Sequence, residues 1–191
     1  YYLDCIDSQY PFKEGILFPN TYFYKKDMLA SSILKQSYNK LDLVLSELWS
    51  KKPPNNILKD KNEALILASI IEKEAGNDNE KSLIASVFLK RIEIGMRLQA
   101  DPTIIYGLLP NFDGDIKKSD ILDKNNPYNT YMIKSLPPTP IAIPSLTSIE
   151  AAVLSTPGEY LFFVANTPTS HYFSKTYDEH LSMIKTLGLN K

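Results

Sequence analysis

Apolar side chains recur every three to four residues along most of this chain, a spacing typical of helices with one buried face. A long amphipathic helix is predicted from about residue 27 and ends before Pro53 and Pro54, which cannot continue it. The pattern predicts further helices over residues 61–75 and 78–94, a turn or two after Asp101, a short helix capped by Thr147 or Ser148, and a last helix that ends near Gly188.

Local signals mark several of these boundaries. Gly76 ends the helix over residues 61–75, because glycine readily leaves the helical conformation. Asn77 followed by Glu80 has the spacing of a capping box for the next helix. Thr176 and Glu179 repeat that spacing, so the sequence predicts a second capping box at the start of the last helix.

Strands are predicted only late in the chain. Residues 160–165 and 171–173 are rich in aromatic and β-prone side chains, whereas residues 107–147 are proline-rich and predicted to be loops. Helices precede strands without the alternation that parallel sheets require. We therefore predict one α+β domain over residues 1–191, with a helical region packed against a small, mostly antiparallel sheet.

Composition excludes several classes of protein. The chain has 191 residues, with 21 basic and 22 acidic side chains, and so lacks the basic field expected of a nucleic-acid-binding protein. A single cysteine, Cys5, allows no internal disulfide. The longest apolar run, residues 65–71, is too short to cross a bilayer. Because the chain begins at Tyr1 rather than methionine, we interpret it as a portion of a longer protein.

Two glutamates near the end of the helix over residues 61–75 are candidates for proton transfer. On a helical wheel, Glu72 and Glu74 flank the apolar stripe on opposite sides, too far apart to share a proton. Desolvation beside apolar surface can raise a carboxyl pKa, as a general acid near neutral pH requires. Periodicity alone does not choose between them, and both also fit ordinary glutamates at the edge of a helix.

Arg91 falls inside the apolar stripe of the next predicted helix, where an unpaired guanidinium would be costly. A structural ion pair with Glu72 would satisfy it and leave Glu74 available for proton transfer. The alternative is that the Arg91 side chain extends along the apolar surface and places its charge in water.

Two later segments concentrate the hydrogen-bonding and aromatic side chains that sugar-binding sites use. The seven candidate substrate-binding residues are Gln99, Asp101, Thr103, Tyr106, Asn129, Thr130 and Tyr131. The same residue types are also common in turns, so the pattern by itself leaves both interpretations open. His171 and His180 have no spacing typical of a zinc site, and the sequence predicts neither a metal nor a cofactor.

Four segments in order resemble the YceG-like domain of the MltG family of bacterial endolytic murein transglycosylases: residues 14–24, 67–107, 126–145 and 160–180. The resemblance implies cleavage of the β-1,4 bond between N-acetylmuramic acid and N-acetylglucosamine in nascent peptidoglycan strands, giving 1,6-anhydromuramyl ends. It also implies that Glu74 is the catalytic residue. Ala75 and Lys90 depart from the residues usual in the family.

The resemblance further implies an N-terminal membrane anchor and a LysM-like module outside this chain, with the catalytic domain on the outer side of the inner membrane. Peptidoglycan synthases are possible partners. Two other functions stay open from the sequence. One is a lysozyme-like hydrolase with Asp101 as second carboxylate. The other is a peptidoglycan-binding module without catalytic activity.

Overall fold

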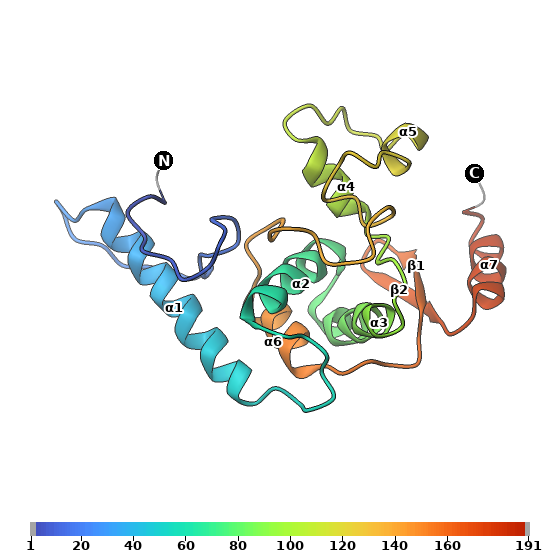
Figure 1. The fold of residues 1–191 in the computed structure, drawn as a ribbon, viewed down its shortest axis with the longest axis horizontal. Helices are drawn as coiled ribbons and strands as arrows, with labels where there is room; N and C mark the ends of the chain where they lie inside the picture. Colours follow the sequence, from blue (N-terminus) through green and yellow to red (C-terminus); the bar gives the residue numbers. More distant parts are fainter. Residues whose placement is uncertain (1–2, 190–191) are drawn as a thin grey trace.

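The computed structural model describes residues 3–189, of which the ordered elements are seven α-helices, one short 3-10 helix and a two-stranded sheet (Figure 1). This confirms the predicted α+β class. The elements are α1 (Ala30–Ser50), α2 (Lys61–Glu74), η1 (Asp78–Glu80), α3 (Lys81–Glu93), α4 (Asp101–Leu108), α5 (Lys118–Ile121), α6 (Leu146–Leu154), β1 (Phe162–Thr167), β2 (Ser170–Ser174) and α7 (Tyr177–Thr186).

Helix α2 is the centre of the core. Its residues 64–71 are buried without interruption, and it packs against α3 and α6 (Figure 1). A helix that is apolar on all sides is stable only when neighbouring elements cover it. Asp60 caps its first turn by accepting a hydrogen bond from the backbone N–H of Glu63. The helix ends with Glu74, so the core fixes the position of that carboxyl group.

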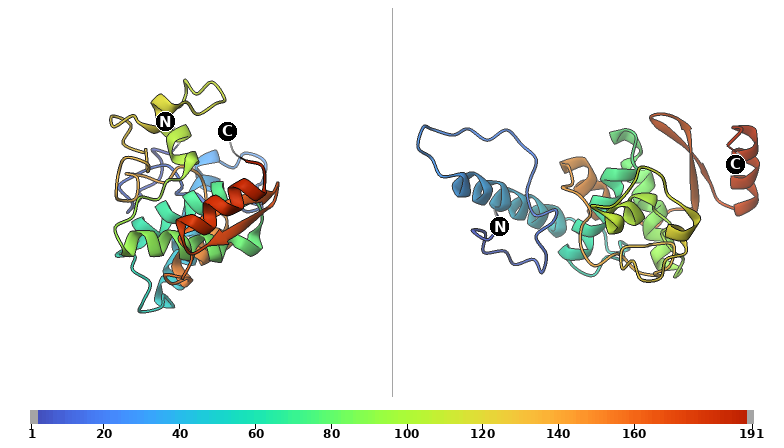
Figure 2. Two further views of the ribbon diagram at one scale, coloured as in Figure 1. Left: turned by 90° about the vertical axis from the view of Figure 1, so that its right-hand side faces the viewer. Right: turned by 90° about the horizontal axis from the view of Figure 1, so that it is seen from above.

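Helix α1 lies at one end of the molecule and extends away from the α2–α3–α6 core (Figures 1 and 2). Its buried residues, Ser37, Tyr38, Leu41, Leu45 and Leu48, have the spacing of a single helical face. The helix starts three residues after the predicted position and stops before Pro53, as expected. The prediction of this element is confirmed.

The β1–β2 hairpin lies at the other end, between the core and α7 (Figure 2). It is antiparallel, with Phe163 opposite Phe173 and Ala165 opposite His171. Its turn reaches the end of α2, where Gly76 is required: a Cβ there would lie 2.8 Å from the Cα of Thr169. The hairpin is thereby held beside Glu74.

Of the three predicted helix caps, the one at α7 is confirmed, the one at Asn77 is confirmed without its capping box, and the one at α6 is wrong. Asn77 accepts a hydrogen bond from the N–H of Asn79 and starts η1, but the Glu80 carboxylate turns to His171 instead of closing a capping box. Helix α6 begins after Ser145, two residues before the predicted cap. The Thr176–Glu179 capping box is present at α7.

Candidate active site

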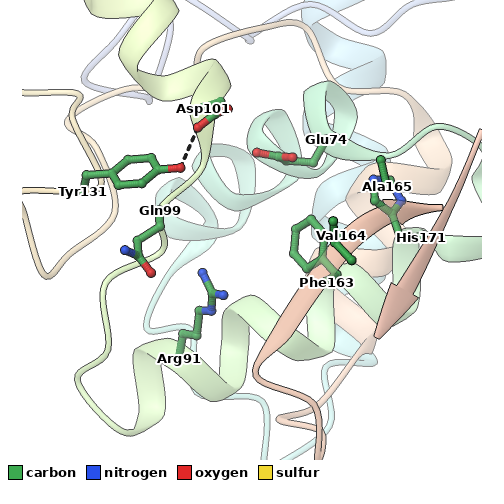
Figure 3. A pocket seen from close by; sticks show the side chains of 9 residues that line it. All are labelled: Glu74, Arg91, Gln99, Asp101, Tyr131, Phe163, Val164, Ala165 and His171. Atoms are coloured by element: carbon green, nitrogen blue, oxygen red, sulfur yellow. Dashed lines mark hydrogen bonds between the residues drawn. The ribbon is translucent and has the colours of Figure 1, made fainter. Parts of the chain in front are cut away.

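A pocket of about 290 Å³ opens where the end of α2, helix α3, the start of α4 and the hairpin meet (Figure 3). Its lining combines ionisable, amide and aromatic side chains with a short apolar wall contributed by β1. The lining residues are Glu74, Arg91, Gln99, Asp101, Tyr131, Phe163, Val164, Ala165 and His171. The pocket therefore gathers side chains from segments up to about half the chain apart.

Glu74 has the protonation behaviour of a general acid. Burial beside the apolar core raises the pKa of its carboxyl group to about 8, and the negative charge of Asp101 adds to this effect. The positive charge of Arg91 acts in the opposite direction but does not cancel the other two. The Glu74 carboxyl group is therefore protonated at neutral pH while it lines an open pocket.

Asp101 and Tyr131 form a pair beside Glu74. The Tyr131 hydroxyl donates a 2.6 Å hydrogen bond to Oδ1 of Asp101, the first residue of α4 (Figure 3). Burial, followed by this hydrogen bond, raises the pKa of Tyr131 above its ordinary value. Gln99 enters the pocket from a left-handed backbone conformation with φ of 52°. Three of the seven predicted substrate-binding residues thus lie in the same pocket as Glu74.

Arg91 does not form the predicted ion pair with Glu72, and that prediction is wrong. Its Nε donates a 2.7 Å hydrogen bond to the Leu161 carbonyl, and a terminal nitrogen donates to the Leu98 carbonyl. The guanidinium also lies 5.5 Å from the Phe162 ring centroid. Backbone carbonyls, which the sequence could not identify as partners, satisfy the buried donors. Burial lowers the Arg91 pKa to about 10, so the group remains a cation at neutral pH.

Glu72 instead pairs with Lys81, at 3.2 Å, on the side of α2 away from the pocket. Its Oε2 also accepts hydrogen bonds from Ser145 Oγ at 2.6 Å and Ser148 Oγ at 2.5 Å. Burial acts to raise the pKa of Glu72, but these hydrogen bonds outweigh it and hold the pKa below its usual value. The two glutamates of α2 therefore have opposite environments, and only Glu74 is biased toward the protonated form.

Three predicted substrate-binding residues are buried with no exposed surface, which contradicts a direct contact with substrate. Thr103 and Thr130 lie 2.9 Å apart, oxygen to oxygen, and the Thr130 hydroxyl accepts from the Ala100 N–H. The Asn129 amide donates to three backbone carbonyls, those of Asp120, Ile121 and Asp123. Thr103 and Thr130 join the start of α4, which carries Asp101, to the loop that carries Tyr131, and Asn129 fixes that loop to the end of α5.

Tyr106 is the seventh predicted substrate-binding residue and does not line this pocket. It lines a separate, more apolar hollow together with Lys73 and Pro102, and its ring lies 4.7 Å from that of Tyr128. The hollow and the pocket are separated by the first turn of α4, because Asp101 faces one and Pro102 the other.

The sequence did not single out the hairpin residues as part of the site. Residues 163–165 and His171 line the pocket opposite α4, although they follow Glu74 by about ninety positions. The packing of the hairpin turn on Gly76 brings these residues to Glu74, and no local sequence pattern indicates that contact. Within residues 3–189, no group of three or more metal-binding side chains is placed to hold a metal ion.

Comparison with known proteins identifies the family of this chain. The YceG-like family matches residues 4–186. The chain belongs to the YceG-like family. An endolytic murein transglycosylase of Bacillus subtilis is 36% identical over 168 residues, which cover 87% of this chain and 46% of that protein. Its counterpart in Streptococcus pneumoniae strain D39 is 33% identical over 171 residues, covering 87% and 31%.

A solved structure of a YceG-like protein from Listeria monocytogenes has the same fold as this chain. It aligns with a TM-score of 0.73 at 35% identity, over 88% of this chain and 54% of that one. The chain spans less than half the length of the two relatives above. In this YceG-like chain, no helix within residues 3–189 has the length and apolar character needed to cross a membrane.

Proposed function

We propose that this chain is the catalytic part of an endolytic murein transglycosylase, with Glu74 as its acid and base. One observation carries the proposal: Glu74 has a pKa of about 8 and lines an open polar pocket. The names of the Bacillus and Streptococcus relatives support the assignment of murein as the substrate. The bond cleaved would be the β-1,4 linkage between N-acetylmuramic acid and N-acetylglucosamine.

The mechanism needs a single proton-transfer group. Glycosidic cleavage requires protonation of the leaving oxygen and stabilisation of a positively charged, oxocarbenium-like transition state. Glu74 would first donate its proton to that oxygen and then take one from the muramyl 6-hydroxyl, which attacks the anomeric carbon of its own ring. The product is a 1,6-anhydromuramyl end. Because the nucleophile belongs to the same sugar, the reaction gains from proximity and needs no activated water.

The residues around Glu74 would stabilise the charges that develop on the sugar ring and on Glu74 during this reaction. Asp101 raises the Glu74 pKa and, as an anion, would also stabilise positive charge developing on the sugar ring. Tyr131 fixes the Asp101 carboxylate through the 2.6 Å hydrogen bond, and Gln99 adds an amide that can bind sugar hydroxyl groups. After proton donation, Arg91 would stabilise the Glu74 carboxylate until it is protonated again.

Peptidoglycan glycan strands are the proposed partner, and the reaction would take place outside the cytoplasmic membrane. An anchor that places the domain there would belong to a part of the protein beyond this chain. Peptidoglycan synthases are candidates for partners, because nascent strands are their product. No metal or cofactor is needed for the proposed proton transfers.

The test is cleavage of purified glycan strands by Glu74→Gln, which keeps the shape of the side chain but cannot cycle a proton. We expect a loss of at least about 10²-fold in rate, the usual contribution of general acid–base catalysis. Glu93→Gln is a matched control, because Glu93 is exposed and lies outside the pocket. Cleavage by Glu74→Gln at the wild-type rate would refute the role of Glu74.

One observation favours a second function. Asp101 shares the pocket with Glu74, so a lysozyme-like hydrolase could use it as the second carboxylate. Mass spectrometry of the products separates the two reactions, because a hydrolase leaves reducing ends that are heavier by one water. Strands that stay intact with the full-length protein would instead indicate a binding module without catalytic activity.

A further inference from the structure

The hairpin wall of the pocket carries a histidine–carboxylate pair that the proposed reaction does not use. His171 lies on β2 and lines the pocket, and Glu80 ends η1 behind it. The Nδ1 of His171 is 2.8 Å from Oε2 of Glu80, while Oε1 of the same carboxylate accepts a 2.9 Å hydrogen bond from the backbone N–H of His171. Both carboxylate oxygens are therefore directed at one residue.

This geometry determines which ring nitrogen of His171 carries the proton. Carboxylate oxygens only accept hydrogen bonds, so Nδ1 must donate and holds the proton. In a neutral ring, Nε2 is then left with a free lone pair and acts as an acceptor. No described residue forms a hydrogen bond with His171 Nε2, and the side chain is 13% exposed.

The ring is also held in place by its surroundings. It lies edge-on to Phe163, with centroids 5.4 Å apart, and 6.4 Å from Phe173. In Figure 3, the Glu74 carboxyl group lies between His171 on one side and the Asp101–Tyr131 pair on the other. A sugar that offers its glycosidic oxygen to Glu74 would thus have hydroxyl groups facing both sides.

We propose that His171 is a substrate-binding residue whose Nε2 accepts a hydrogen bond from a hydroxyl group of the bound glycan. Glu80 is a positioning residue that fixes the tautomer and orientation of the ring. The inference rests on the proposed function, because the hydroxyl group belongs to the glycan. It adds a hydrogen-bond acceptor on the wall of the pocket opposite Asp101 and Tyr131.

Glu80→Gln tests the positioning role without removing the contact. The backbone N–H of His171 can only donate, so the amide oxygen must face it and the amide NH₂ must face Nδ1. That arrangement makes Nδ1 the acceptor and moves the proton to Nε2. The substitution is therefore expected to invert the tautomer of His171, which a merely structural glutamate would not do. Glu159→Gln is a matched control, since Glu159 is exposed and pairs with Lys175 away from the pocket.

The experiment follows the ¹⁵N resonances of the His171 ring by NMR in the 191-residue chain. At a pH where the His171 ring is neutral, the wild type should carry the ring proton on Nδ1, Glu80→Gln should carry it on Nε2, and Glu159→Gln should match the wild type. A neutral wild-type ring that carries its proton on Nε2 would overturn the inference.

The contact itself is tested by adding soluble glycan strands, freed of peptides by an amidase, to the Glu74→Gln protein. The Nε2 resonance should move as it accepts a hydrogen bond. His171→Ala, with Glu74 intact, should raise KM about three- to tenfold with little change in kcat, as expected for loss of one hydrogen bond formed equally in the ground and transition states.

The two proposals fail in different ways. Glycan that changes the chemical shifts of Gln99 and Asp101 but not that of His171 Nε2 would overturn this inference alone. So would an unchanged KM in a folded His171→Ala protein. Glycan that causes no shift anywhere in the pocket would overturn the proposed function and this inference together.

Discussion

The raised pKa of Glu74 makes the unfolding free energy depend on pH, and comparison with Glu74→Gln measures that dependence. The pKa of Glu74 is about 8 in the folded protein, whereas its ordinary value is 4.5. At a pH between these two values, the folded state therefore binds a proton that the unfolded chain does not hold. The stability that this proton contributes is fully present below about pH 4.5 and is lost as the pH rises through about 8. A glutamine at this position has no such dependence.

The magnitude follows from the two pKa values. The shift from 4.5 to about 8 sets an upper limit of roughly 4 kcal/mol on the stability that Glu74 loses between pH 5 and pH 9. Because the pocket is open, water solvates part of the ionised group and reduces this cost. We therefore expect the unfolding free energy of Glu74→Gln, relative to wild type, to rise by about 1–3 kcal/mol over this interval.

The assay is urea-induced unfolding followed by circular dichroism at pH 5, 7 and 9 for both proteins. Glu72→Gln is the control, because the pKa of Glu72 is lowered and its stabilising effect is lost only in acid. The Glu72→Gln difference from wild type should therefore stay nearly constant from pH 5 to pH 9. A Glu74→Gln difference that is equally flat would refute the raised pKa, and with it the reason for choosing Glu74 as the general acid.

Three further predictions concern the framework of the site. Glu72→Gln should lower the unfolding free energy by about 1–3 kcal/mol, because the buried Lys81 loses one of its two carboxylate partners and keeps only Asp78; a loss below about 0.5 kcal/mol in chemical denaturation would contradict this. Tyr131→Phe should reduce kcat/KM for glycan cleavage about tenfold by freeing Asp101, and an unchanged value in steady-state assays would exclude that role. Gly76→Ala should cost about 1–3 kcal/mol, because the new methyl group meets the hairpin backbone, and an unchanged melting temperature would count against the tight contact.

The sequence determined the elements whose causes are local. Apolar spacing predicted α1, α2 and α3, and the Thr176–Glu179 capping box is present at α7. The same pattern placed Glu72 and Glu74 at the two edges of one buried face. The resemblance to the family selected Glu74, and the opposite pKa shifts of the two carboxyl groups supply a physical reason for that choice.

Only the tertiary structure decided which side chains meet in the site. Arg91 donates hydrogen bonds to backbone carbonyls and does not pair with Glu72. The side chains of Thr103 and Thr130 are buried against each other, and Tyr106 lines a different hollow. The His171–Glu80 pair joins residues 91 positions apart. Hydrophobic periodicity indicates which face of each segment is buried in the core. The partners of a buried polar group depend instead on how the segments pack together. That packing is a property of the whole chain, so no local pattern contains it.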